Sequence, residues 1–61
     1  MATIKFKGGG SREVSNTTGL IFKDSVEKKE DVRIAMHDTV SGFFVIKTED
    51  IESVTGIEEK G

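Results

Sequence analysis

The apolar run 43–46 constrains the fold more than any other feature of the chain. It joins two phenylalanines to two β-branched residues, a composition typical of a β-strand. Successive side chains of a strand point to opposite faces, so Phe44 and Ile46 point one way and Phe43 and Val45 the other. Both faces of this strand are apolar, and both therefore need cover.

The chain of 61 residues can build one small core but not two domains. We therefore expect a single β domain, 1–61, in which one face of the central strand lines the core. The other face either contacts a partner or is covered by the ends of a strongly bent barrel. The chain has no cysteine, which excludes disulfides and thiolate metal sites and favours a reducing, cytoplasmic location. No run approaches the roughly 18 apolar residues of a membrane span, so we expect no membrane contact.

Alternation of apolar and polar residues predicts further strands. Polar and apolar residues alternate over 3–7, which predicts a strand that ends at the glycine-rich loop 8–11. Residues 12–15 are expected to return beside it as a short edge strand. Residues 32–37 alternate again, and the polar loop 38–42 connects them to the central strand. This arrangement predicts an antiparallel hairpin.

The remaining segments show weaker patterns. Residues 16–19 have the composition of a turn, and the apolar run 20–22 is interpreted as another strand. Residues 23–31 are expected to form a polar connection in which Asp24 and Glu27 could cap one short helical turn. The last segments are a turn at 48–51, a strand at 52–57 and a frayed tail at 58–61.

Five or six short strands with tight connections predict an all-β fold. The expected architecture is a small antiparallel barrel or a strongly curved sheet, in the size range of SH3-like and Sm-like domains. The predicted core residues are Ile4, Phe6, Leu20, Phe22, Ile34, Phe44 and Ile46.

The sequence contains no recognisable catalytic pattern. His37 is the only histidine, and its neighbour Asp38 would point to the opposite face of a strand. The carboxylates near the loops lack the spacing of a calcium loop, and the three glycines 8–10 lack the lysine and helix of a phosphate-binding loop. We therefore expect no enzyme activity, no cofactor and no metal ion.

The preferred hypothesis is a small β module that acts through protein–protein contact, either with another protein or by self-association, most simply as a homodimer. The two-sided central strand motivates this hypothesis, because its second face would otherwise be an exposed apolar patch. The candidate interface residues are Phe43, Val45, Ile21 and Val14.

The alternative hypothesis is a nucleic-acid-binding barrel for RNA or DNA. Residues 1–30 contain six basic and four acidic residues, a net charge of +2, whereas residues 31–61 have three basic and seven acidic residues. A basic face on the N-terminal half would attract phosphates. The candidate residues of this face are Lys5, Lys7, Arg12, Lys23, Lys28 and Lys29.

Overall fold

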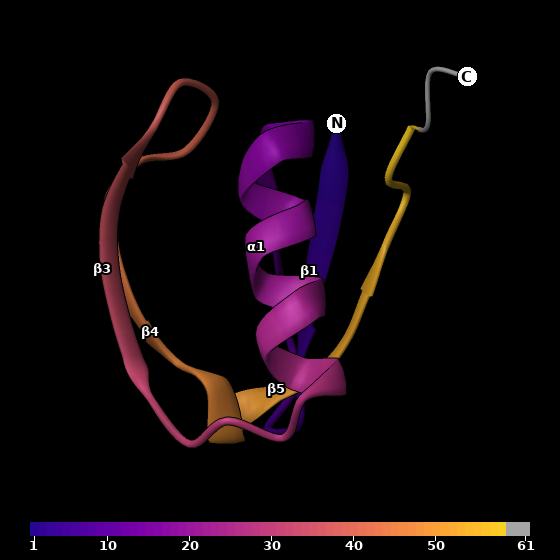
Figure 1. The fold of residues 1–61 in the computed structure, drawn as a ribbon. Helices are drawn as coiled ribbons and strands as arrows, with labels where there is room; N and C mark the ends of the chain where they lie inside the picture. The colour runs from indigo at the N-terminus through magenta and orange to yellow at the C-terminus, as the bar shows by residue number, and fades with distance from the viewer. Residues whose placement is uncertain (59–61) are drawn as a thin grey trace.

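The computed structural model describes residues 1–58 and shows an α+β fold (Figure 1). The elements are β1 (Ala2–Phe6), β2 (Ser11–Val14), α1 (Asn16–Glu27), β3 (Arg33–Asp38), β4 (Gly42–Lys47), the 3₁₀ turn η1 (Thr48–Asp50) and β5 (Ile51–Thr55).

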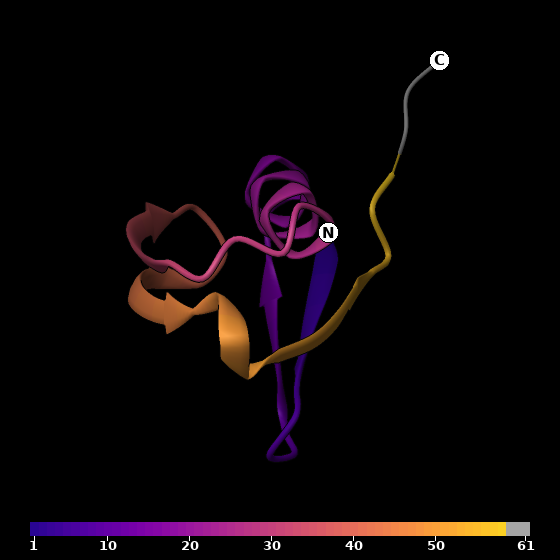
Figure 2. The same cartoon turned by 60° about the horizontal axis from the view of Figure 1, so that its bottom comes forward.

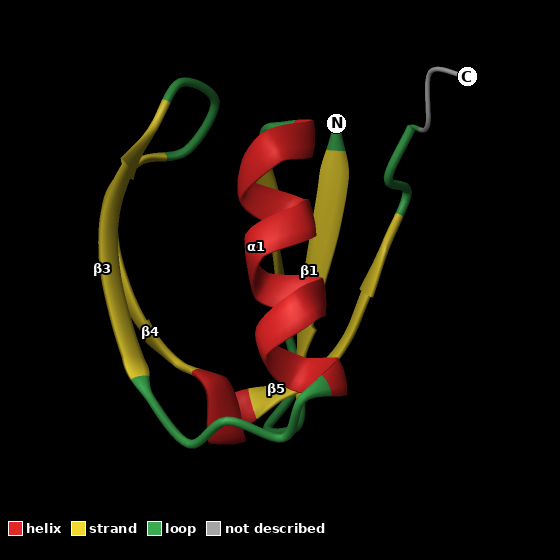
Figure 3. Cartoon of the chain, in the orientation of Figure 1, coloured by secondary structure: helices red, strands yellow, loops and turns green. Residues whose placement is uncertain are grey.

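The strands form two separate antiparallel sheets, as Figure 3 shows. One sheet has the order β2-β1-β5, and β3 pairs only with β4. The all-β barrel or curved sheet predicted from the sequence is therefore wrong. A 12-residue helix replaces the predicted strand at 20–22, and among residues 1–58 the two sheets stay open.

Helix α1 begins and ends with well-formed caps. Ser15 is the N-cap, and its hydroxyl accepts a hydrogen bond from the Thr18 amide at 3.4 Å. At the other end, Lys29 adopts a left-handed conformation with φ of 56°, and its amide donates to the carbonyl of Val26 at 3.1 Å. The Glu30 amide donates to the carbonyl of Ser25 at 3.1 Å, which completes a Schellman motif. The turn predicted at 16–19 and the cap predicted at Asp24 both lie inside this helix.

The buried face of α1 is built mainly from small residues. Thr18, Gly19 and Ser25 are buried beside a single large side chain, Phe22. Gly19 lies so close to β1 that a Cβ added there would collide with the Cβ of Ala2. The helix therefore approaches the three-stranded sheet closely, and no broad apolar stripe is required.

The three-stranded sheet confirms the predicted return of the chain after β1. Ala2 pairs with Val14 and Lys5 with Ser11, across a loop in which Gly9 and Gly10 have φ of 100° and 84°. Those positive angles suit glycine, which has no Cβ to clash. On its other side β1 pairs with β5, which ends two residues earlier than the predicted strand at 52–57.

The predicted hairpin at 32–37 and 43–47 is confirmed, with strands at 33–38 and 42–47. Its inner face packs on the rest of the molecule through Phe44, whose ring centroid is 5.9 Å from that of Phe22 in α1. Ile46 is also buried, and Ile34 is partly buried.

The core confirms four of the predicted residues. Ile4, Phe22, Phe44 and Ile46 are buried, and Phe6 and Ile34 pack at the edge of the core. The prediction for Leu20 is wrong, because the helix carries this side chain to the surface, where it is 45% exposed. The other buried apolar residues are Ala2, Val14 and Ile51.

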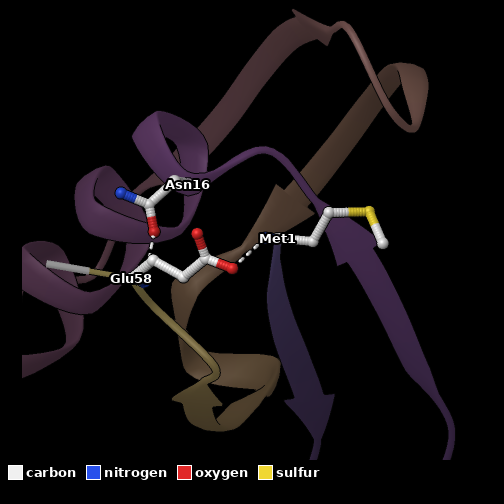
Figure 4. A network of polar contacts seen from close by, with 3 residues as sticks. All are labelled: Met1, Asn16 and Glu58. Atoms are coloured by element: carbon white, nitrogen blue, oxygen red, sulfur yellow. Dashed lines mark hydrogen bonds and ion pairs between the residues drawn. The ribbon is translucent and has the colours of Figure 1, made fainter. Parts of the chain in front are cut away.

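The end of the described chain contacts the start of the molecule (Figure 4). The amide of Glu58 donates to Oδ1 of Asn16 at 2.6 Å, and the Glu58 carboxylate lies 3.7 Å from the amino group of Met1. Glu58 thus has defined partners, whereas the rest of the tail predicted at 58–61 falls outside the described residues.

Candidate functional site

The hairpin has one face that the rest of the domain does not cover. Its strand register places Ala35 opposite Val45 and His37 opposite Phe43, and cross-strand partners share a face. All the residues on this side are exposed. We call this surface the outer hairpin face; it consists of Arg33, Ala35, His37, Phe43, Val45 and Lys47.

The outer hairpin face points away from the core. Phe44 contacts Phe22 of α1, so its neighbour Phe43 must point to the opposite side of the strand. Figure 1 shows the hairpin curving around α1, and Figure 2 again shows α1 beside the hairpin. Phe43 is 70% exposed and Val45 is 51% exposed, so the most exposed phenylalanine of the domain lies on a regular strand and not on a loop.

The tip of the hairpin is fixed by the buried carboxylate of Asp38. Oδ1 accepts hydrogen bonds from the hydroxyls of Ser15 at 2.7 Å and Thr18 at 2.5 Å. Oδ2 accepts from the loop amides of Val40 at 2.8 Å and Ser41 at 2.9 Å. One side chain therefore joins the start of α1 to the hairpin loop.

These hydrogen bonds keep Asp38 ionised. Burial raises the pKa of Asp38, but the hydrogen bonds from the two hydroxyls and the two loop amides outweigh burial and hold the pKa well below its ordinary value. Both carboxylate oxygens already accept hydrogen bonds from the protein, and the low pKa disfavours uptake of a proton. Asp38 therefore serves as a structural anchor and is unsuited to act as a base.

The base of the hairpin is anchored by Thr48. Its hydroxyl donates to the carbonyl of Glu30 at 2.6 Å and accepts from the amide of Val32 at 3.0 Å. With both ends held, the hairpin presents the outer hairpin face on a fixed backbone.

The structure brings together two of the four predicted interface residues. Phe43 and Val45 lie on the outer hairpin face. Ile21 is 42% exposed, but it lies on α1, on the other side of the hairpin. The side chain of Val14 is fully buried in the core, while its strand β2 lies at the edge of the three-stranded sheet.

Sequence reasoning did not name the polar members of this face. Arg33 and Lys47 lie directly opposite each other at one end, and His37 lies beside Phe43 at the other. The alternation that placed Phe43 also places these residues, since they occupy the same side of the two predicted strands.

The six candidate basic residues do not form one face. Lys5 lies on the outer side of the three-stranded sheet. Arg12, on the neighbouring strand, is the cross-strand partner of Ile4 and shares its side, which faces the hairpin. There its guanidinium donates to the Ser41 hydroxyl at 2.6 Å and lies 5.3 Å from the centroid of the Phe44 ring. Lys28 is paired with Asp24 at 3.0 Å on α1.

The other basic residues are also dispersed or neutralised by neighbours. Lys23 is on α1 and partly buried. Lys7 and Lys29 line one hollow of about 200 Å³, but the acidic side chains around the same hollow balance them. These are Glu30, Asp31 and Glu49. A continuous phosphate-binding track is not formed by these six positions.

The single histidine and the acidic residues of the described chain are dispersed. Within residues 1–58, no three potential metal-ligating side chains come together. His37 faces outward next to Phe43, while Asp38 points inward to its own hydrogen-bond partners. No helix in this part of the chain has the length and apolar character needed to cross a bilayer.

Comparison of the chain with protein-family models, with curated proteins and with solved structures found no match.

Proposed function

We propose that this chain is a non-enzymatic, cytoplasmic interaction module that binds a second copy of itself through the outer hairpin face. The observation that carries the proposal is the 70% exposure of Phe43 on a regular strand, beside the half-exposed Val45. Burying a side chain of this kind contributes roughly 1.5–3 kcal/mol, which an isolated domain leaves unused.

No comparable apolar surface exists on the other sheet. The outer side of the three-stranded sheet carries polar residues, so water can solvate it. These residues are Thr3, Lys5, Ser11, Glu13, Ser53 and Thr55. The contrast between the two sheets supports a contact role for the hairpin.

The size of the face indicates weak association. A six-residue strand is about 20 Å long, and a two-stranded face with its side chains is about 10 Å wide. Such a face offers a few hundred Å², well below the roughly 800 Å² per partner of a standard interface. We therefore expect a reversible dimer that forms in the micromolar range or above.

Light scattering and sedimentation across a concentration series test this proposal. The parent should change from the monomer mass to twice that mass as its concentration rises. Phe43→Glu should remain a folded monomer throughout, because it places a charge in the contact. Leu20→Glu is the matched control, since Leu20 is exposed on α1 and away from the outer hairpin face.

A parent that stays monomeric at millimolar concentration would contradict self-association. Loss of association in Leu20→Glu as well as in Phe43→Glu would place the contact elsewhere. Retention of the monomer on immobilised RNA or DNA, reduced by salt, would favour the alternative function instead.

A further inference from the structure

The outer hairpin face has two chemically different ends. Arg33 and Lys47, both cationic, are direct cross-strand partners at the end near η1. Like charges in this position repel each other. Among residues 1–58, neither forms an ion pair, although the carboxylates of Asp31 and Glu49 line the same hollow beyond the strands. The opposite end carries Phe43 with His37.

Two symmetric arrangements can stack this face on itself. A two-fold axis between the copies must lie in the plane of the contact. If the axis runs along the strands, equivalent ends meet, and the Arg33–Lys47 pairs of the two copies lie over each other. If the axis runs across the strands, the ends exchange, and each cationic pair lies over the aromatic end of the other copy.

We propose that the second copy binds turned end for end, so that Lys47 of each copy lies over the Phe43 ring of the other. This inference rests on the proposed self-association and specifies its geometry. The central row, Ala35 and Val45, then lies over itself and forms the apolar middle of the contact.

The end-for-end arrangement is favoured by charge. It removes the contact between four cations that the other arrangement creates, and it replaces that contact with two symmetric cation–π interactions. It also gives Lys47 an interaction that its position opposite Arg33 does not provide. The outer hairpin face is thus complementary to itself only when one copy is turned end for end.

The sign of one substitution distinguishes the two arrangements. Lys47→Ala should weaken the end-for-end dimer by about 5- to 30-fold, because each dimer loses two cation–π contacts. In the other arrangement the same change would relieve repulsion and tighten the dimer. Lys5→Ala, an exposed lysine on the three-stranded sheet, is the control and should leave the dissociation constant unchanged.

Cross-linking of single-cysteine variants provides an independent measurement, since the chain has no cysteine of its own. Stacked sheets lie about 10 Å apart, which a short bis-maleimide can span. An equal mixture of Arg33→Cys and His37→Cys should cross-link into a mixed dimer, whereas Arg33→Cys alone should not. The two positions are four residues apart on β3, about 13 Å, so the two patterns are well separated.

Cross-linking of Arg33→Cys with itself, or tighter association of Lys47→Ala, would overturn the end-for-end arrangement while leaving self-association intact. A parent that shows no concentration-dependent mass would instead contradict the proposed function, and with it this inference.

Discussion

Asp38 shows how one polar side chain can organise two elements of a small domain. Its carboxylate lies 2% exposed between the N-cap of α1 and the hairpin loop, and it accepts hydrogen bonds from both. Burial of an unpaired charge would be costly, but charge-assisted hydrogen bonds to every side of this carboxylate offset the cost. The position of the outer hairpin face therefore depends on a residue outside that face.

Stability should depend on the ionisation of Asp38. The folded pKa lies below the unfolded value of about 3.9, so the folded state binds fewer protons. The contribution of Asp38 to stability is therefore complete at neutral pH. It begins to be lost as the pH falls to the unfolded pKa and continues to be lost toward the lower folded pKa. Thermal unfolding of the parent and Asp38→Asn, followed from pH 7 to pH 2.5, measures this contribution.

In these measurements the parent should be the more stable protein at pH 7, and the difference in melting temperature should shrink as the pH falls. The other carboxylates are common to both proteins and cancel in the comparison. An equal difference at every pH would show that Asp38 acts through its shape and not through its charge.

At the scale of elements, the helix and the hairpin illustrate what local sequence can and cannot predict. The hairpin was predicted correctly because its evidence is local: two alternating segments flank a polar loop that ends in Gly42. The helix was missed because its buried face is made of Thr18, Gly19 and Ser25, residues that favour turns when considered alone. Its large apolar residues Leu20 and Ile21 point outward.

Gly19 is the clearest example of information absent from the local pattern. As part of Asn-Thr-Thr-Gly it resembles the end of a turn, yet its role is to let α1 approach β1. That role depends on Ala2, which is distant in the chain. The end of α1 was also hidden from the sequence, because its left-handed cap is Lys29, whereas glycine is the residue that ordinarily indicates such a helix end.

Gly19→Ala tests the close approach. In an exposed helix position this change would stabilise by about 1 kcal/mol, because alanine has the higher helix propensity. Here the added methyl meets the Cβ of Ala2, and we expect a net destabilisation of about 1–2 kcal/mol from overpacking. Chemical denaturation measures the change in unfolding free energy.

Thr17→Ala is the matched control for this experiment, since Thr17 is exposed on the same helix. It should leave stability unchanged or raise it by a few tenths of a kcal/mol. If Gly19→Ala stabilised the protein to a similar degree, the helix would have to lie further from β1 than the structure shows.

Truncation of the two neighbouring phenylalanines of β4 should change stability by very different amounts. Phe44→Ala removes a ring buried against Phe22 and should cost about 3–5 kcal/mol, enough to approach the whole stability of a domain this small. Phe43→Ala removes an exposed ring and should change stability by less than about 0.5 kcal/mol in the dilute monomer. Urea unfolding at low protein concentration compares the two variants, and equal losses of stability would contradict the assignment of Phe44 to the buried face and Phe43 to the exposed face.

At the scale of the whole molecule, the number of strands was close to the prediction but their assembly was not. The pairing of β1 with β5 joins the two ends of the described chain, and no local pattern specifies it. A register shift between Lys5 and Phe6 further allows Ile51 and Val54, three residues apart, both to pack against the core. Sequence periodicity assigned these residues only to a turn and a strand.

The candidate site was predictable in part, because the alternation of faces along a strand is a local property of the sequence. The apolar strand with two faces already indicated that Phe43 and Val45 would lie opposite Phe44, and the structure places both on the surface. The addition of Ile21 depended on a strand at 20–22, whereas Val14 was added through pairing of an edge strand, and β2 is indeed an edge strand of its sheet. Because 16–27 is a helix, Ile21 no longer lies on a strand beside Phe43.

The proposed dimer should make the stability of the molecule depend on its concentration. A partner that binds only the folded state stabilises it by mass action, so the melting temperature of the parent should rise as concentration passes through the dissociation constant. A free protein concentration 100 times the dissociation constant stabilises the folded state by about 2.7 kcal/mol, which raises the melting temperature of a domain of this size by several degrees. Phe43→Glu should melt at one temperature at every concentration, and Leu20→Glu should follow the parent. Scanning calorimetry from low micromolar to millimolar protein makes the comparison, and a parent curve as flat as that of Phe43→Glu would show that the exposed ring has no partner in a second copy of this chain.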